Sequence, residues 1–167
     1  LGLMGRVLEA MYEMHCDPTA VAAAFGVHVP LIEISDLMEA YNDVKEEQVE
    51  EKKALILREF ETPDPVSDPV TRKLTEDDLE QSARSAVALD ILVDRFKLNG
   101  MAYYYEGSDG SPERKVATSL IVGNSILNAQ GIPMCGEFDI KTNIAMFIMD
   151  KLDIGGSFAE LHPFDFN

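Results

Sequence analysis

Carboxylate side chains follow three predicted strands of this chain, and carboxylates are the groups that bind hard cations and transfer protons. They are Glu106, Glu137, Asp139 and Glu160. In an open parallel sheet the ligand lies at the carboxyl ends of the strands, so these acids are expected at one shared edge. Two carboxylates from neighbouring strand ends can hold a divalent ion such as Mg²⁺ or Mn²⁺. Since 30 of the 167 residues are Asp or Glu, a chance grouping is the alternative interpretation.

Glu137 has the most informative surroundings of these acids. It follows Gly136, which permits unusual backbone angles, and it precedes a predicted helix whose N-terminal dipole would keep a carboxylate ionised. Its alternative role is to cap that helix. Asp139 fits the capping role better, which leaves Glu137 for another function.

Three further side chains are candidates near the predicted edge. Strand alternation places Glu160 and His162 on one face, where each is either a metal ligand or a solvent-facing surface residue. Tyr105 is the last residue of the aromatic segment 103–105 and directly precedes Glu106. We expect Tyr105 to contact a ligand, whereas the rest of this segment is typical of a core strand.

The elements that must position these residues follow from apolar spacing and from capping signals. A spacing of three to four predicts helices over 7–14, 18–25, 36–41, 45–61, 75–98, 113–130 and 140–152. Asp17 with Pro18 begins the second helix, Gly26 ends it, and Thr75 caps the fifth. Short β-rich runs predict strands over 27–34, 101–105, 132–135 and 157–161.

Helices and strands alternate from residue 75 onward, with short connections between them. This pattern predicts an α/β fold, a three-layer α-β-α sandwich with a mainly parallel, Rossmann-like sheet. Three prolines mark a loop at 62–70, which either joins two halves of one domain or separates two domains. We expect a single domain over 1–167, because each half alone is too small for a full sheet.

Composition excludes several classes of function. Lys and Arg number 14 against 30 acids, and the net charge of −16 repels phosphate backbones and anionic lipids. We therefore expect neither nucleic acid nor membrane as a partner. The two cysteines, Cys16 and Cys135, have no CxxC spacing and are typical of free thiols in a cytoplasmic protein.

Two glutamate-containing segments together resemble the L-arabinose isomerase family. They are Gly136-Glu137-Phe138-Asp139-Ile140-Lys141-Thr142 and Gly155-Gly156-Ser157-Phe158-Ala159-Glu160. The likeness extends over most of the chain from about Met4, and includes the segments 102–107 and 121–125. The resemblance implies the central domain of a three-domain aldose–ketose isomerase, here a fragment that we expect to be inactive alone.

The resemblance also implies a mechanism and a set of site residues. Glu137 and Glu160 match the two glutamates that bind Mn²⁺, or another divalent cation, and that act as acid and base in an enediol pathway from L-arabinose to L-ribulose. In the family two histidine ligands lie downstream of the second glutamate; they are expected to be absent from this fragment, and His162 matches neither. Tyr105 and Met4 are the implied sugar contacts, and a homo-oligomer, a trimer or hexamer, is the implied assembly. A sugar- or metal-binding module, or an oligomerisation module, without catalysis is the alternative.

Overall fold

A parallel sheet of four strands, in the order β2-β1-β3-β4, forms the centre of the structure. The structure is a computed structural model that describes residues 1–62, 66 and 72–159. The strands are β1 (Gly2–Gly5), β2 (Leu31–Ile32), β3 (Met101–Tyr104) and β4 (Met134–Cys135). The α-helices are α1 (Pro18–Phe25), α2 (Ile34–Asn42), α3 (Glu46–Glu59), α4 (Glu76–Phe96), α5 (Pro112–Thr118), α6 (Ile121–Ala129) and α7 (Ile140–Lys151).

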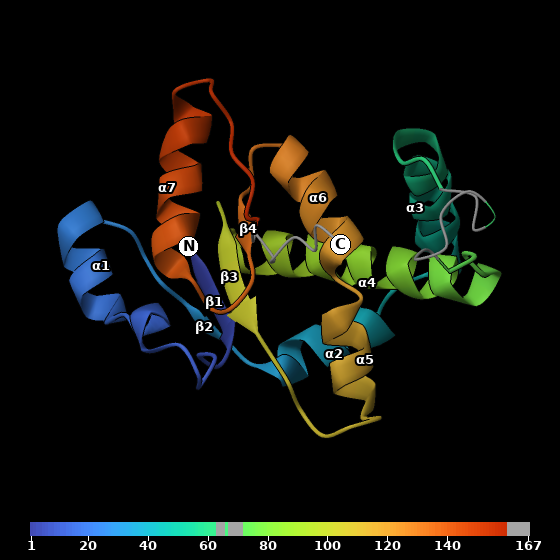
Figure 1. Ribbon diagram of the computed structural model, residues 1–167, viewed down its shortest axis with the longest axis horizontal. Helices are drawn as coiled ribbons and strands as arrows, with labels where there is room; N and C mark the ends of the chain where they lie inside the picture. The colour runs from blue at the N-terminus through green and yellow to red at the C-terminus, as the bar shows by residue number, and fades with distance from the viewer. Residues whose placement is uncertain (63–65, 67–71, 160–167) are drawn as a thin grey trace, which may run out of the picture.

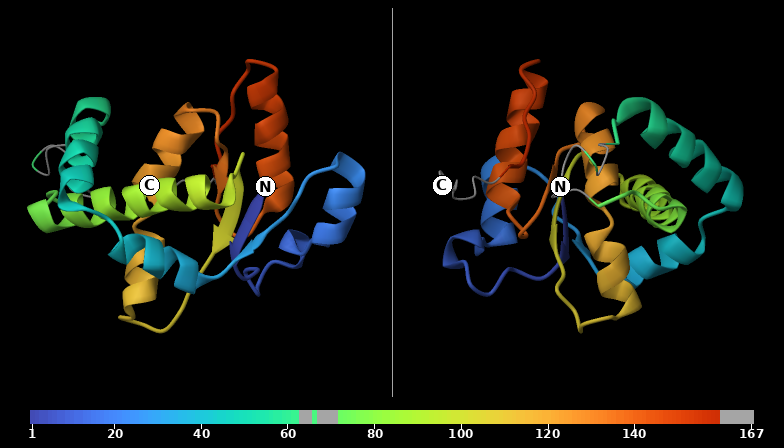
Figure 2. Two further views of the ribbon diagram at one scale, coloured as in Figure 1. Left: turned by 180° about the vertical axis from the view of Figure 1, so that it is seen from behind. Right: turned by 45° about the vertical axis from the view of Figure 1, so that its right-hand side comes forward.

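Side chains alternate between the two faces of the sheet and build two cores. On one face, Leu3, Ala102 and Cys135 pack with residues of α1 and α7. On the other face, strand residues pack into a larger core with α2, α4, α5 and α6; they are Met4, Ile32, Met101, Tyr103 and Met134. Figures 1 and 2 show these helices on the two sides of the sheet. The architecture is the predicted three-layer α-β-α sandwich, and its sheet is entirely parallel within the described residues.

Helix α4 is the main helix of the larger core, and its start was predicted correctly. The Thr75 hydroxyl accepts from the Asp78 backbone N–H, and the Asp78 carboxylate accepts from the Thr75 backbone N–H, which closes a capping box. The helix ends at Lys97, which has a left-handed backbone. Helix α3 packs on the outer side of α4, mainly through Val49 and Ile56, and so lies farthest from the sheet (Figure 1).

The first thirty residues differ most from the prediction. Strand β1, which lies between β2 and β3, was not predicted, since its four residues are too few to show a period. The helix predicted over 7–14 is wrong: only a 3₁₀ turn forms there, at Tyr12–Met14, with no buried residue. A short helix in water needs an apolar face packed on a neighbour, and this segment has none.

The single helix predicted over 113–130 is divided into α5 and α6. The hydroxyls of Thr118 and Ser119 bond back to carbonyls of the preceding turn, which ends α5. Gly123 in α6 then packs closely on α4, where a Cβ would lie 3.0 Å from the Cα of Ala86. Helix α6 therefore takes a direction that a continuous helix would not allow.

Two predicted segments lie partly or wholly outside the described residues. The strand predicted over 157–161 is absent at 157–159, which carries no strand, and its remainder is not described. The proline-rich loop at 62–70 is described only at residues 62 and 66. Among the helices that the structure describes, none has the length and apolar character needed to cross a membrane.

Candidate functional site

At the carboxyl edge of the sheet, the connections that follow the neighbouring strands β1 and β3 leave toward opposite faces. After β1 the chain enters α1, whose Val21 packs in the smaller core. After β3 the chain enters α5 and α6, whose Val116 and Ile126 pack in the larger core on the opposite face. The loops after these adjacent strands therefore lead to opposite sides of the sheet. In open α/β sheets, this is the position where ligands bind.

Three polar side chains meet at this position. An Arg6 guanidinium nitrogen lies 3.0 Å from a carboxylate oxygen of Glu106, and both side chains are 53% exposed. The Tyr104 side chain lies close enough to both charged groups to feel their charges. Burial, followed by the charge of Glu106, raises the pKa of Tyr104, which keeps the phenol protonated as a donor. We call these three residues the Arg6–Glu106–Tyr104 cluster.

Gly5 allows the backbone of β1 to reach this cluster. Its φ of 86° lies in the left-handed region, and a Cβ at this position would lie 2.1 Å from the Tyr104 carbonyl oxygen. The next residue, Arg6, donates its backbone N–H to that same carbonyl at 3.0 Å. Only glycine permits this close approach of the two strand ends, and the approach directs Arg6 toward Glu106.

At the end of β4 the backbone of two residues is strained. Glu137 and Phe138 have φ values of 57° and 65°, which side chains other than glycine rarely adopt. The turn is held to β3 by the Phe138 backbone N–H, which donates to the Tyr103 carbonyl at 3.1 Å. Strain of this kind costs on the order of 1–3 kcal/mol per residue and is concentrated at functional sites. Glu137 is partly buried in this turn.

Asp139, not Glu137, caps helix α7, as the sequence indicated. Its carboxylate accepts from the backbone N–H groups of Lys141 and Thr142 at 3.1 and 3.0 Å, and from the Thr142 hydroxyl. Asp139 is only 6% exposed, so its side chain is committed to this cap. The N-terminus of α7 therefore does not require the carboxylate of Glu137.

The two segments that carry the family resemblance lie against each other. A Cβ placed on Gly136 would lie 3.2 Å from Cε1 of Phe158, so the aromatic ring packs on the backbone directly before Glu137. Phe158 is also packed against the smaller core. The described part of the second segment thus returns to the carboxyl end of β4. Glu160 and His162 themselves lie outside the described residues.

The resemblance implies Glu137 and Glu160 as metal ligands, and of these two the structure describes Glu137. Glu137 stands at the edge of the sheet, where a metal ligand of this fold would lie. Within residues 1–62, 66 and 72–159, no group of three or more His, Cys, Asp and Glu side chains could hold a metal ion. The described residues alone therefore do not form a metal site.

Of the remaining residues considered from the sequence, Met4 and Cys135 are buried in the cores, and Tyr105 is partly buried at the edge. Met4 is fully buried in the larger core, so in this structure it packs the sheet and offers no surface to a sugar. Tyr105 lies at the edge, partly buried against the same core, and its ring lies over Gly107, where a Cβ would be 2.6 Å away. Burial raises the pKa of Cys135 to about 12, which is consistent with an inert thiol.

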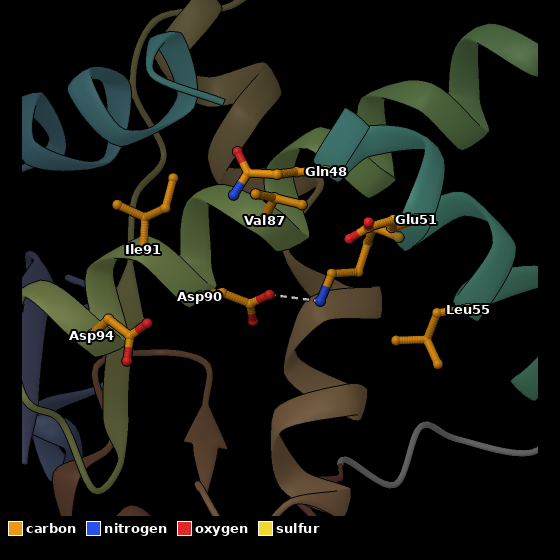
Figure 3. A pocket seen from close by; sticks show the side chains of 8 residues that line it. Gln48, Glu51, Leu55, Val87, Asp90, Ile91 and Asp94 are labelled. Carbon is orange, nitrogen blue, oxygen red and sulfur yellow. Dashed lines mark hydrogen bonds and ion pairs between the residues drawn. The ribbon is translucent and has the colours of Figure 1, made fainter. Parts of the chain in front are cut away.

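Of the hollows that lie away from this edge, two involve α3. One, of about 300 Å³, separates α3 from α4 and is crossed by the ion pair of Lys52 with Asp90 (Figure 3). The other, of about 420 Å³, lies between α3 and α6 and includes Phe60 and Ile126. Neither contains a residue that the sequence singled out for chemistry.

Sequence reasoning missed Arg6, Tyr104 and the role of Gly5. Gly5 and Arg6 depend on β1, which was not predicted, whereas Tyr104 lies in the strand predicted over 101–105 and was assigned to the core. The signal was present in the apolar run Gly2-Leu3-Met4 that precedes Gly5 and Arg6. Such a run is consistent with a buried parallel strand, but a run this short does not distinguish a strand from a turn.

The fold and its edge define an α/β domain of the Rossmann-like class with polar groups at the ends of its central strands. A comparison with models of known protein families found no match for this chain. A search of curated proteins also found no significant match.

Proposed function

We propose that this chain is the central domain of a metal-dependent aldose–ketose isomerase of the L-arabinose isomerase type. Such an enzyme converts L-arabinose to L-ribulose through an enediol. The observation that carries the proposal is the packing of Phe158 on Gly136, which brings together the two segments that resemble the family. It is supported by the strained backbone of Glu137, the glutamate of the first segment.

The strain at Glu137 argues for a role beyond folding. Asp139 already caps α7, so the turn gains no helix cap from a glutamate at position 137. A glycine would adopt the same left-handed backbone without the steric cost of a Cβ. A carboxylate at such a position supports the proposed role of its oxygen atoms.

In the proposed reaction Glu137 and Glu160 move one proton between C2 and C1 of the open-chain sugar. One carboxylate removes the proton from C2 of the aldose, and the electron pair forms the enediol double bond. The C1 carbonyl oxygen takes up a proton to give the enediol, the O2 hydroxyl gives up its proton as C2 becomes the carbonyl, and the proton removed from C2 is delivered to C1, which gives the ketose. Glu137 and Glu160 are also the proposed ligands of Mn²⁺ or another divalent cation, which would polarise the sugar oxygens. Tyr105 at the same edge is the proposed sugar contact, and a cytoplasmic homo-oligomer is the proposed assembly.

The test is the variant Glu137→Gln in the protein that contains this chain with its natural flanking sequence. We expect formation of L-ribulose from L-arabinose with Mn²⁺ to fall by about 10²-fold or more, because the amide keeps the volume but accepts no proton. Glu59→Gln, an exposed change on α3, is the matched control and should leave turnover unchanged. Full turnover by Glu137→Gln would contradict the proposal, provided that circular dichroism shows an unchanged fold.

A binding module without catalysis is the second candidate, and one observation favours it. The Arg6–Glu106–Tyr104 cluster is assembled entirely from described residues, whereas only one of the proposed catalytic carboxylates is. Sugar binding without turnover in the metal-loaded protein would support this candidate over the isomerase.

A further inference from the structure

We infer that the hollow between α3 and α4 binds a linear aliphatic polyamine. The hollow lies away from the carboxyl edge of the sheet, so its occupancy does not depend on the proposed isomerase activity. Its volume of about 300 Å³ is at the lower limit of small-molecule sites, which suits a slender ligand. Residues spaced three and four apart on each helix line it, so one face of α3 and one face of α4 form its walls.

The apolar part of the lining comes from both helices. Figure 1 shows α3 crossing α4 at a steep angle, so the two helix surfaces separate away from their contact. At the contact Val49 and Ile56 are buried in the larger core, whereas Leu55 and Ile91 are only partly covered and line the hollow together with Val87. These hydrocarbon side chains match the methylene groups of a polyamine, which need an apolar surface.

The charged part of the lining is anionic. Glu51, Asp90 and Asp94 face a single base, Lys52. Figure 3 shows Asp94 and Glu51 on opposite sides of the dashed line that marks the ion pair of Asp90. Among the described residues, no group of three or more His, Cys, Asp and Glu could hold a metal ion, so these carboxylates do not converge on one compact cation. They suit a cation whose charges are spread along a chain.

Lys52 shows that the hollow accommodates an ammonium group on a methylene chain. Its side chain is only 12% exposed, and its Nζ lies 2.6 Å from a carboxylate oxygen of Asp90. The methylene stem is therefore covered while the ammonium group is paired. A polyamine consists of the same two chemical groups, so it can repeat this arrangement with the other carboxylates of the hollow.

Glu51 and Asp94 are the carboxylates that can pair with added amino groups. Both are exposed, and among the described residues neither forms an ion pair. By contrast, Glu46 at the start of α3 is already paired with Arg84. Hydrogen bonds from ammonium groups to carboxylates are charge-assisted, and the net charge of −16 also attracts polycations to the protein.

The experiment is isothermal titration of the protein with spermidine, a linear triamine, in about 0.15 M salt. We expect Glu51→Gln and Asp94→Asn each to weaken binding about threefold, and the double variant about tenfold, because each change removes one charge from the hollow. Glu59→Gln on α3 and Asp77→Asn on α4 are the matched controls, since both residues are exposed and lie outside the hollow. Each control should bind spermidine like the unmodified protein.

Lys52→Met tests the same site with the opposite sign. It removes the ammonium group that competes for Asp90, so spermidine should bind about threefold more tightly. Spermidine should also bind more tightly than Mg²⁺, a compact dication, and more tightly than hexylamine, which carries one charge. Circular dichroism checks that each variant keeps its fold.

Four outcomes would overturn the inference. They are no binding of spermidine, binding that the double variant leaves unchanged, weaker binding by folded Lys52→Met, and Mg²⁺ binding as tight as that of spermidine. Tighter binding of tetralysine that depends on Glu51 and Asp94 would also overturn it, because the hollow would then belong to a basic peptide segment. Turnover of L-arabinose enters none of these measurements, so they stand or fall separately from the isomerase test.

Discussion

Glu137 and Phe138 are adjacent residues that both adopt a left-handed backbone at the end of β4. A Cβ in this region meets the following carbonyl oxygen, so each residue lowers the stability of the protein. Lys97, at the end of α4, has the same strain but belongs to no candidate site. Lys97 therefore serves as a comparison for Glu137. The strained backbone of Lys97 lies at a helix end, whereas that of Glu137 lies in the proposed site.

We predict that Glu137→Gly is more stable than Glu137→Ala by about 1 kcal/mol in urea denaturation. Both variants lose the side chain, so their difference reports only the cost of the left-handed backbone. The pair Lys97→Gly and Lys97→Ala should show a similar difference. Equal stabilities of the two Glu137 variants would mean that the turn is not strained.

The same variants separate stability from function. Both changes at position 137 should abolish turnover in the intact protein, whereas both changes at position 97 should preserve it. Loss of activity in Lys97→Gly but not in Lys97→Ala would show that relief of backbone strain by itself disturbs the enzyme.

Among the helices, α3 is held on α4 by charged contacts as well as by its apolar face. Lys52 forms an ion pair with Asp90, drawn as a dashed line in Figure 3. The Lys52 nitrogen lies 2.6 Å from the Asp90 carboxylate oxygen, and the Lys52 side chain is only 12% exposed. Lys53 pairs with Glu76, and Arg84 pairs with Glu46. Because α3 lies outside the second layer, these contacts add to its apolar attachment through Val49 and Ile56.

We predict a coupling energy of about 1 kcal/mol between Lys52 and Asp90 in a double-mutant cycle of Lys52→Met and Asp90→Asn. The cycle is measured by urea denaturation at low salt and repeated in 1 M salt, where the Debye length falls to about 3 Å. The partly covered pair should keep most of its coupling. Arg58 with Glu59, an exposed pair on α3, is the control and should show almost none. Equal coupling in the two pairs would contradict the prediction.

The cap of α4 gives the fold a defined response to acid. The hydrogen bond from the Thr75 hydroxyl, followed by that from its backbone N–H, lowers the pKa of Asp78 below its ordinary value of 3.8. A carboxyl group whose pKa is lowered by folding stabilises the fold above its unfolded pKa. That stability is lost as the pH falls through the lower, folded pKa.

We therefore predict that Asp78→Asn loses less stability than the unmodified chain as the pH falls below about 4. At pH 7 the variant should be less stable than the unmodified chain, and the two should converge in acid. Thermal unfolding measured across this range tests the prediction. Asp77→Asn, in the same first turn without a hydrogen bond to Thr75, is the control. Parallel curves for Asp78→Asn and the unmodified chain would contradict it.

Across the molecule as a whole, one buried amide joins two layers. The Asn143 side chain of α7 donates to the carbonyls of Met101 and Pro133 at 3.1 and 2.7 Å, and it is fully buried. Met101 begins β3 and Pro133 directly precedes β4. The amide therefore fixes α7 against two neighbouring strands and so determines where the Glu137 turn lies relative to β3.

We predict that Asn143→Leu lowers the free energy of unfolding by about 2 kcal/mol, because two buried carbonyls lose a donor. For a chain of this size, the midpoint of thermal unfolding should fall by about 4–8 °C. Asn42→Leu, at an exposed position in α2, should change stability by less than about 0.5 kcal/mol. An unchanged midpoint for Asn143→Leu would show that the amide does not hold the layers together.

Features that depend on neighbouring residues follow from the amino-acid sequence alone. The caps at Asp17, Thr75 and Asp139 and the long apolar period of α4 are set within one or two turns of chain, so pattern alone predicted these helices. The α/β class followed from their alternation with short apolar strands. For the same reason Glu137 could be recognised as a candidate from its immediate neighbours, Gly136 and Asp139.

What distant residues do together depends instead on how the chain packs. Arg6 and Glu106 are 100 residues apart in the chain and meet because β1 pairs with β3, an event that four residues of β1 do not encode by themselves. The contact of Gly123 with Ala86 divides α5 from α6, and that of Phe158 with Gly136 joins the two motif segments. Such contacts depend on which surfaces meet, and packing is a property of the folded chain rather than of any local segment.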